Sequence, residues 1–171
     1  MKNRLEITKG GRFAKIIGNF GENVVCNWLS RSGFDVALID HTGIDVVAYQ
    51  PTTKKRLGIT VKSRTRLAGS ENDSVNLFPN LSGDGDRQRV IDACKAFACE
   101  PWIAVYVETR KQADLYLTSL ENFEAKYIRS DSAGGVWNMS PKSREQYALD
   151  PAVKHVYFKF GSKNWRWQRS R

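Results

Sequence analysis

Apolar residues near the start of the chain recur at the spacing of an amphipathic helix. The positions concerned are Ile17, Phe20, Val24, Val25, Trp28 and Leu29. They predict a first helix from about Phe13 to Ser32. Gly33 follows directly, and glycine is typical of the residue that ends a helix.

Three short apolar runs come next, at residues 35–40, 44–49 and 57–63. Runs of this length that are rich in valine, isoleucine and tyrosine are typical of strands. The segment 50–55 between the last two runs is polar and contains Pro51, which predicts a hairpin loop. The second and third strands should therefore be antiparallel neighbours.

The rest of the chain alternates between polar and apolar segments. In chain order we expect a long loop over 68–86, a helix over 86–99, strands over 102–107 and 114–118, a short helix over 119–127, a polar region over 129–150 and a last strand over 153–160. This order predicts an α/β fold with a mixed central sheet flanked by helices and an αβββαβ core. The length of 171 residues predicts a single domain over 1–171, with its core at about 13–128 and a basic, aromatic C-terminal appendage at about 129–171.

Basic residues outnumber acidic ones, 27 against 18, which gives a net charge of +9. The excess is clustered, because residues 54–66 hold six basic residues and no acid. The tail from residue 159 onward holds five more and again no acid, together with Phe160, Trp165 and Trp167. A basic surface favours an anionic partner, and nucleic acid is the commonest one. The alternative is a basic protein whose charge serves only solubility.

Other features argue against several classes of protein. No apolar run approaches the roughly 20 residues that a membrane-spanning helix needs. The N-terminal stretch also lacks the apolar segment of a signal peptide, so we expect a cytoplasmic protein without a membrane partner. Cys26, Cys94 and Cys99 contain no CxxC pair, which favours core packing over a metal site or a disulfide. His41 and His155 lack ligand spacing, which argues against zinc.

Glu22 places a carboxylate on the apolar side of the predicted first helix. It precedes Val25, Cys26 and Leu29 by three, four and seven residues, so its side chain lies on the same stripe. A carboxylate that faces a core costs several kcal/mol unless it is paired or binds a cation. The alternative is a position at the edge of the stripe, from which the carboxylate reaches solvent.

Asp45 and Lys62 are charged residues on two predicted strands whose other positions are largely apolar. Asp45 follows the turn residue Gly43, and Lys62 shares one face of its strand with Gly58 and Thr60. The hairpin would bring that face alongside Asp45. The alternatives are a turn aspartate that caps its own backbone and a solvent-facing lysine on an edge strand.

These residues together resemble the PD-(D/E)XK nuclease superfamily, which includes restriction endonucleases and archaeal Holliday-junction resolvases. The matching segments are Gly18-Asn19-Phe20-Gly21-Glu22, Gly43-Ile44-Asp45-Val46-Val47 and Ile59-Thr60-Val61-Lys62-Ser63. A helix glutamate, a strand aspartate, a hairpin and a lysine strand follow one another in the order of the superfamily core, over roughly residues 13–107. The resemblance implies a restriction-endonuclease-like fold.

The resemblance also implies an enzyme, a Mg²⁺- or Mn²⁺-dependent endonuclease of resolvase or restriction type that hydrolyses DNA phosphodiester bonds. Its catalytic residues would be Glu22, Asp45 and Lys62, with Asp45, Glu22 and Thr60 at the metal. The metal would polarise the phosphate and activate water, and Lys62 would orient that water or stabilise developing charge. The resemblance implies DNA, including branched DNA, as the partner, and it is compatible with a homodimer. It is also compatible with a prokaryotic, phage or mobile-element origin of the chain.

Thr60 departs from the superfamily pattern, which has Glu, Asp or Gln two residues before the lysine. A threonine hydroxyl is a neutral and weaker ligand, so the site loses one formal charge of attraction for a cation. Glu22 is one candidate to compensate, and the long loop offers four others: Glu71, Asp73, Asp84 and Asp86. Thr60 is equally compatible with a catalytically inactive DNA-binding module.

Candidate DNA contacts lie in three places. Ser63, Arg64 and Arg66 follow the lysine strand, Gln88 and Arg89 open the second helix, and Lys163 and Arg166 belong to the tail. A helix N-terminus favours phosphate. The tail tryptophans either stack on bases or pack onto the domain or a dimer partner. A protein that binds RNA through its tail, with a structural Asp45/Lys62 pair, is the remaining alternative function.

Overall fold

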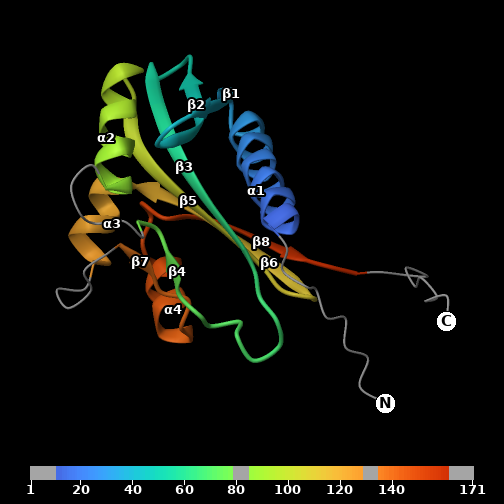
Figure 1. Cartoon of the computed structure of the whole chain (residues 1–171). Helices are drawn as coiled ribbons and strands as arrows, with labels where there is room; N and C mark the ends of the chain where they lie inside the picture. The colour runs from blue at the N-terminus through green and yellow to red at the C-terminus, as the bar shows by residue number, and fades with distance from the viewer. Residues whose placement is uncertain (1–10, 79–84, 129–134, 162–171) are drawn as a thin grey trace.

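The computed structural model describes residues 11–78, 85–128 and 135–161 (Figure 1). A six-stranded sheet in the order β1-β2-β3-β5-β6-β8 forms its centre. These strands are β1 (Asp35–His41), β2 (Ile44–Gln50), β3 (Lys55–Thr65), β5 (Glu100–Glu108), β6 (Gln112–Ser119) and β8 (Lys154–Lys159). Neighbouring strands are antiparallel except β3 and β5, which are parallel. The mixed sheet agrees with the predicted fold class.

Helices cover both faces of this sheet (Figure 1). They are α1 (Gly11–Arg31), α2 (Asp86–Ala96), α3 (Leu120–Lys126) and α4 (Pro141–Leu149), and a two-stranded ribbon pairs β4 (Val75–Asn76) with β7 (Val136–Trp137). One core cluster joins α1 to the sheet, and the other joins α2, α3 and α4 to the opposite face. None of the described helices is long and apolar enough to cross a membrane.

Successive side chains of strand β3 point alternately into these two cores. Leu57 and Ile59 belong to the core under α1. Gly58 faces α2, since a Cβ there would lie 2.6 Å from Sγ of Cys94. Thr60 therefore continues the α2 face of the strand, as the alternating pattern predicts.

The described part of the chain after α3, residues 135–161, belongs to the same core and sheet as the preceding elements. Trp137, Met139 and Tyr147 are almost fully buried, and β8 completes one edge of the main sheet. Asp150, at the end of α4, accepts hydrogen bonds from the side chains of Asn122, Lys126 and Tyr127. The polar region expected over 129–150 thus contains β7 and α4, which the apolar periodicity did not reveal.

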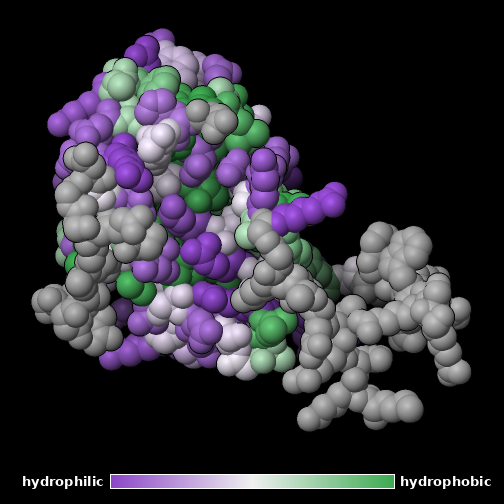
Figure 2. Space-filling model, in the orientation of Figure 1, coloured by the Kyte–Doolittle hydropathy of each residue, from purple (hydrophilic) through white to green (hydrophobic). Residues whose placement is uncertain are grey.

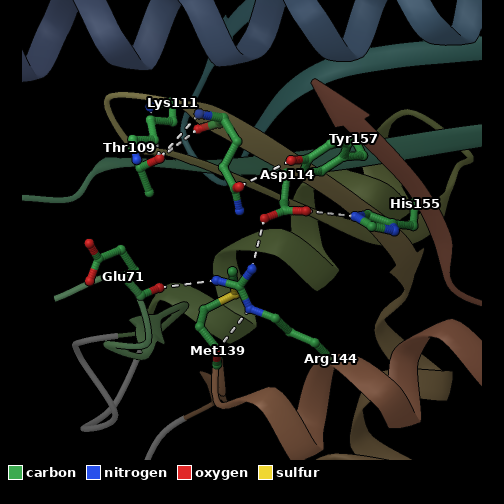
Figure 3. Close-up of polar contacts among 9 residues, drawn as sticks. Glu71, Thr109, Lys111, Asp114, Met139, Arg144, His155 and Tyr157 are labelled. Atoms are coloured by element: carbon green, nitrogen blue, oxygen red, sulfur yellow. Dashed lines mark hydrogen bonds and ion pairs between the residues drawn. The ribbon is translucent and has the colours of Figure 1, made fainter. Parts of the chain in front are cut away.

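Arg144 of α4 ties the long loop after β3 to the sheet (Figure 3). Its guanidinium donates to Asp114 of β6 at 3.0 Å, to the carbonyl of Met139 and to the carbonyl of Glu71 in the loop. Asp114 is buried and also lies 2.9 Å from Nε2 of His155. One side chain therefore connects β6, α4 and the loop that leads to α2.

We predict that Arg144→Ala lowers the free energy of unfolding by about 3–5 kcal/mol, because it leaves the buried Asp114 carboxylate without its guanidinium. Urea titration of the purified variant measures this change. Arg87→Ala is the control, since Arg87 also pairs with a carboxylate, Glu124, but its side chain is 45% exposed. A loss of about 1 kcal/mol or less is expected there. Equal losses in the two variants would contradict the anchoring role.

Candidate active site

Strands β2 and β3 separate at the point where Asp45 stands. Their paired register runs from Val46–Ile59 to Gln50–Lys55, and Asp45 precedes the first of these pairs. Beyond the register, Oδ2 of Asp45 accepts a hydrogen bond of 2.6 Å from the backbone N–H of Val61. The carboxylate thus bridges the two strands where their backbone pairing stops.

A pocket of about 140 Å³ opens at this fork. Asp45, Thr60 and Lys62 line it together, as the predicted hairpin required. Its other walls are Thr42, Gly43, Phe78, Asp86, Arg89 and Val90. Two strands, the β1–β2 turn, the segment after β4 and the start of α2 therefore meet at one place.

The Asp45 carboxylate is held in a partly desolvated position. Burial raises its pKa, and the Val61 N–H, the Lys62 ammonium and the Thr60 hydroxyl offset part of that rise. The local partners compensate only in part for the solvation that the buried carboxylate loses. A nearby cation would therefore stabilise its ionised form.

Gly43 allows α2 to close the pocket. Its φ is +110°, a region that residues with a side chain rarely adopt. A Cβ there would also overlap the carbonyl oxygen of Arg89, and would lie 3.0 Å from the nitrogen of Val90. Only glycine lets the first turns of α2 lie directly on the turn that precedes Asp45.

Glu22 stands on α1, whose buried residues pack on the sheet face opposite α2. Glu22 is partly buried. The pKa of Cys26 is raised chiefly by the burial of its thiol, and the negative charge of Glu22 adds to that rise. Glu22 is not among the residues that line the pocket. Within the described residues, no group of three or more His, Cys, Asp or Glu side chains could hold a metal. Metal ligation by Glu22 stays a prediction.

The residues expected to contact DNA have varied surroundings. Ser63 lies beside Gly21 of α1, and its hydroxyl is buried without a hydrogen-bond partner among the described residues. Arg66 donates to the carbonyls of Asp73 and Ser74, so it fastens the long loop. Arg64 donates to the carbonyl of its neighbour Ser63, and burial lowers its pKa.

The remaining expected contacts lie on α2 or in the tail. Gln88 donates to Asp92 on the outer side of α2, whereas Arg89 lines the pocket. Lys163 and Arg166 lie outside the described residues. The sequence offered Asp86 as one of four loop acids that could compensate for Thr60, and Arg89 as a DNA contact, but it did not place either residue in the wall of the Asp45 pocket.

Comparison with known proteins shows a likeness in structure and none in sequence. The sequence matches no family model and no curated protein. Among solved structures, the chain resembles Hjc, a Holliday junction resolvase from the archaeal hyperthermophile Archaeoglobus fulgidus, with a TM-score of 0.50 and 14% identity. The match covers 75% of this chain and 88% of that one. The chain has the restriction-endonuclease-like fold. The predicted likeness to the PD-(D/E)XK superfamily is thus confirmed for the fold, and the fork of this restriction-endonuclease-like domain carries the pocket.

We predict that Gly43→Ala destabilises the protein by about 3 kcal/mol or more, from backbone strain together with displacement of α2. Gly69→Ala is the matched control, because Gly69 also has a positive φ, +92°, but a Cβ there meets nothing within 4 Å. Strain alone should cost it about 1–2 kcal/mol. Urea titrations measure both values, and similar losses would show that the approach of α2 to Gly43 is unimportant.

We predict that Asp45→Asn raises the free energy of unfolding by about 1 kcal/mol at pH 7 in buffer with EDTA. The pKa of Asp45 is raised in the folded state, so the ionised carboxylate is disfavoured there and the penalty grows as the pH rises through that pKa. Asparagine keeps an acceptor for the Val61 N–H. The gain should vanish below the unfolded pKa of about 3.9, and a gain that persists at pH 3 would contradict this explanation.

Proposed function

We propose that this chain is a divalent-metal-dependent endonuclease that hydrolyses DNA phosphodiester bonds at the Asp45–Lys62 pocket. The observation that carries the proposal is the convergence of a carboxylate, a hydroxyl and a lysine amine in one pocket at the fork of a restriction-endonuclease-like sheet. The structural neighbour acts on Holliday junctions, which supports DNA, including branched DNA, as the substrate.

The pocket donors fit a hard cation. Asp45 offers carboxylate oxygens and Thr60 a hydroxyl, and Mg²⁺ and Mn²⁺ take oxygen ligands of this kind. The raised pKa of Asp45, caused chiefly by burial, agrees with an anion that would gain from a cation. When bound, the metal would add charge stabilisation at the scissile phosphate and lower the pKa of the attacking water.

The side chains of the chain itself would divide the remaining work. Lys62, on the same strand face as Thr60, can donate hydrogen bonds to the attacking water or to the phosphate oxygens as negative charge builds on them. Arg89, at the opposite wall, adds a second cation near the phosphate. Asp45 remains fixed by the Val61 N–H, so its second oxygen is directed by the backbone and not by a mobile rotamer.

The charge of the chain is suited to an anionic polymer as partner. Hydrophilic residues are spread over the described face seen in Figure 2, interspersed with apolar areas. The chain carries a net charge of +9, and each phosphate that a basic residue neutralises releases counterions. DNA binding should therefore weaken steeply as the salt concentration rises.

A catalytically inactive DNA-binding module is the second candidate. Its supporting observation is Thr60, which is 3% exposed and occupies the position of the superfamily's second acid. Without that carboxylate the pocket holds less negative charge for a cation, while the basic surface is unaffected.

We predict that the protein cleaves linear, nicked or four-way-junction DNA in Mg²⁺ or Mn²⁺, and that Asp45→Ala and Lys62→Ala each reduce the rate by about 10²–10³-fold, as expected for groups that act on the transition state. Single-turnover gel assays at fixed salt measure these rates. Lys95→Ala is the control, because Lys95 is an exposed lysine in the last turn of α2 and is not a pocket residue.

The outcomes separate the two candidates. Protein that shifts DNA in a gel but cuts none of the substrates with either metal is the inactive module. Cleavage that survives both Asp45→Ala and Lys62→Ala would place the chemistry elsewhere.

A further inference from the structure

The donors named so far leave the pocket one carboxylate short. Mg²⁺ sites in proteins that act on phosphates commonly use one or two carboxylates together with the substrate. Asp45 supplies one, and Thr60 supplies only a neutral hydroxyl. A second anion would have to come from another residue that lines the pocket.

Asp86 is the second carboxylate in the pocket wall. It is the first residue of α2, whereas Asp45 and Thr60 come from β2 and β3. Gly43 permits the close approach of α2 to the β1–β2 turn, and that approach sets Asp86 across the pocket from the strands. Asp86 is therefore held by the packing of a core helix, in contrast to an acid on a free loop.

The contacts of Asp86 leave its carboxylate available. Its ion-pair partner is Arg89, with Nη1 at 3.5 Å from Oδ1, and the Arg89 side chain is 49% exposed. Exposed pairs of this kind are weak. The residue before Asp86, Gly85, provides no side-chain cap that would occupy the same space.

We propose that Asp86 supplies the divalent-cation site with the carboxylate that Thr60 lacks. This rests on the proposed function, because it concerns the same pocket and the same metal. The acid of the usual strand position is replaced here by an acid on the helix that faces the strand. Glu22, which stands on α1 and does not line the pocket, is then unnecessary as the second anion.

Metal binding without DNA tests this directly. Isothermal titration calorimetry with MnCl₂ and MgCl₂ compares the wild-type protein with Asp86→Asn, Asp45→Asn and Glu22→Gln. We expect the Asp86→Asn and Asp45→Asn variants each to bind at least about tenfold more weakly, the loss for one removed charged ligand. Glu22→Gln should remain within about twofold of wild type.

Asp92→Asn is the matched control. Asp92 lies on the same helix, is exposed and accepts a hydrogen bond from Gln88, but it is not a pocket residue. The same charge is removed from α2 in both variants. Wild-type affinity in Asp92→Asn therefore separates ligation from a general effect of helix charge.

A rescue variant adds a second, independent readout. Thr60→Glu in the Asp86→Asn background returns a carboxylate to the strand and should restore Mn²⁺ affinity to within about threefold of wild type. A merely structural Asp86 would not be rescued in this way. Urea titration in EDTA checks that each variant is folded, and Asp86→Ser replaces Asp86→Asn if the latter is not.

Each outcome decides the matter. Loss of Mn²⁺ binding in Asp86→Asn but not in Asp92→Asn, with rescue by Thr60→Glu, supports the proposal. Unchanged binding in Asp86→Asn, while Asp45→Asn abolishes it, overturns the role of Asp86 and leaves the proposed nuclease intact. Loss in Glu22→Gln instead identifies Glu22 as the second acid. A wild-type protein that binds neither metal overturns both the inference and metal-dependent cleavage.

Discussion

The hydrogen bond from the Val61 N–H to Asp45 determines how the site is built. It replaces the backbone pairing of β2 and β3 at the point where the strands separate, so the fork contains a carboxylate and not a continuous ladder. An unpaired backbone N–H at this depth would be costly. The bond also fixes β3 relative to Asp45, and alternation along β3 then directs Thr60 and Lys62 into the same pocket. The same hydrogen bond therefore ends the pairing of β2 and β3 and positions the polar side chains of the pocket.

The walls of the pocket depend on parts of the chain that are distant in sequence. Phe78, which is 2% exposed and follows β4 by two residues, forms an apolar wall. Arg66 binds the long loop after β3 through the carbonyls of Asp73 and Ser74, and Arg144 binds it through the carbonyl of Glu71. A basic residue expected to contact DNA thus has a structural use, because a guanidinium can satisfy several carbonyls that no secondary structure pairs.

Periodicity predicted the elements with long, regular apolar patterns. The first helix, the β2–β3 hairpin and α2 all lie close to their expected limits, and the mixed sheet followed from their order. It did not reveal α4, whose Ser140-Pro141 start has the features of a helix N-cap and first residue but precedes only one buried residue, Tyr147. The grouping of Asp45, Thr60 and Lys62 could be predicted from the sequence, because a local hairpin brings their two strands together. Asp86 was one of four loop acids offered as a replacement for the missing carboxylate, and the sequence could not choose among them, because the approach of Asp86 to the pocket depends on the packing of α2 against Gly43.

The position of an acid on α2 depends on how the helix packs against the sheet. A carboxylate at position 60 would be held by β3, whose pairing with β5 extends from Leu57 to Thr65. A carboxylate at position 86 is held instead by the docking of one helix, through Gly43 on one side and Cys94 against Gly58 on the other. A ligand that binds only the docked state stabilises that state by mass action. If the proposed site binds a cation through Asp86, its affinity is coupled to the docking of α2, so that substitutions under the far end of α2 would weaken metal binding without touching any ligand.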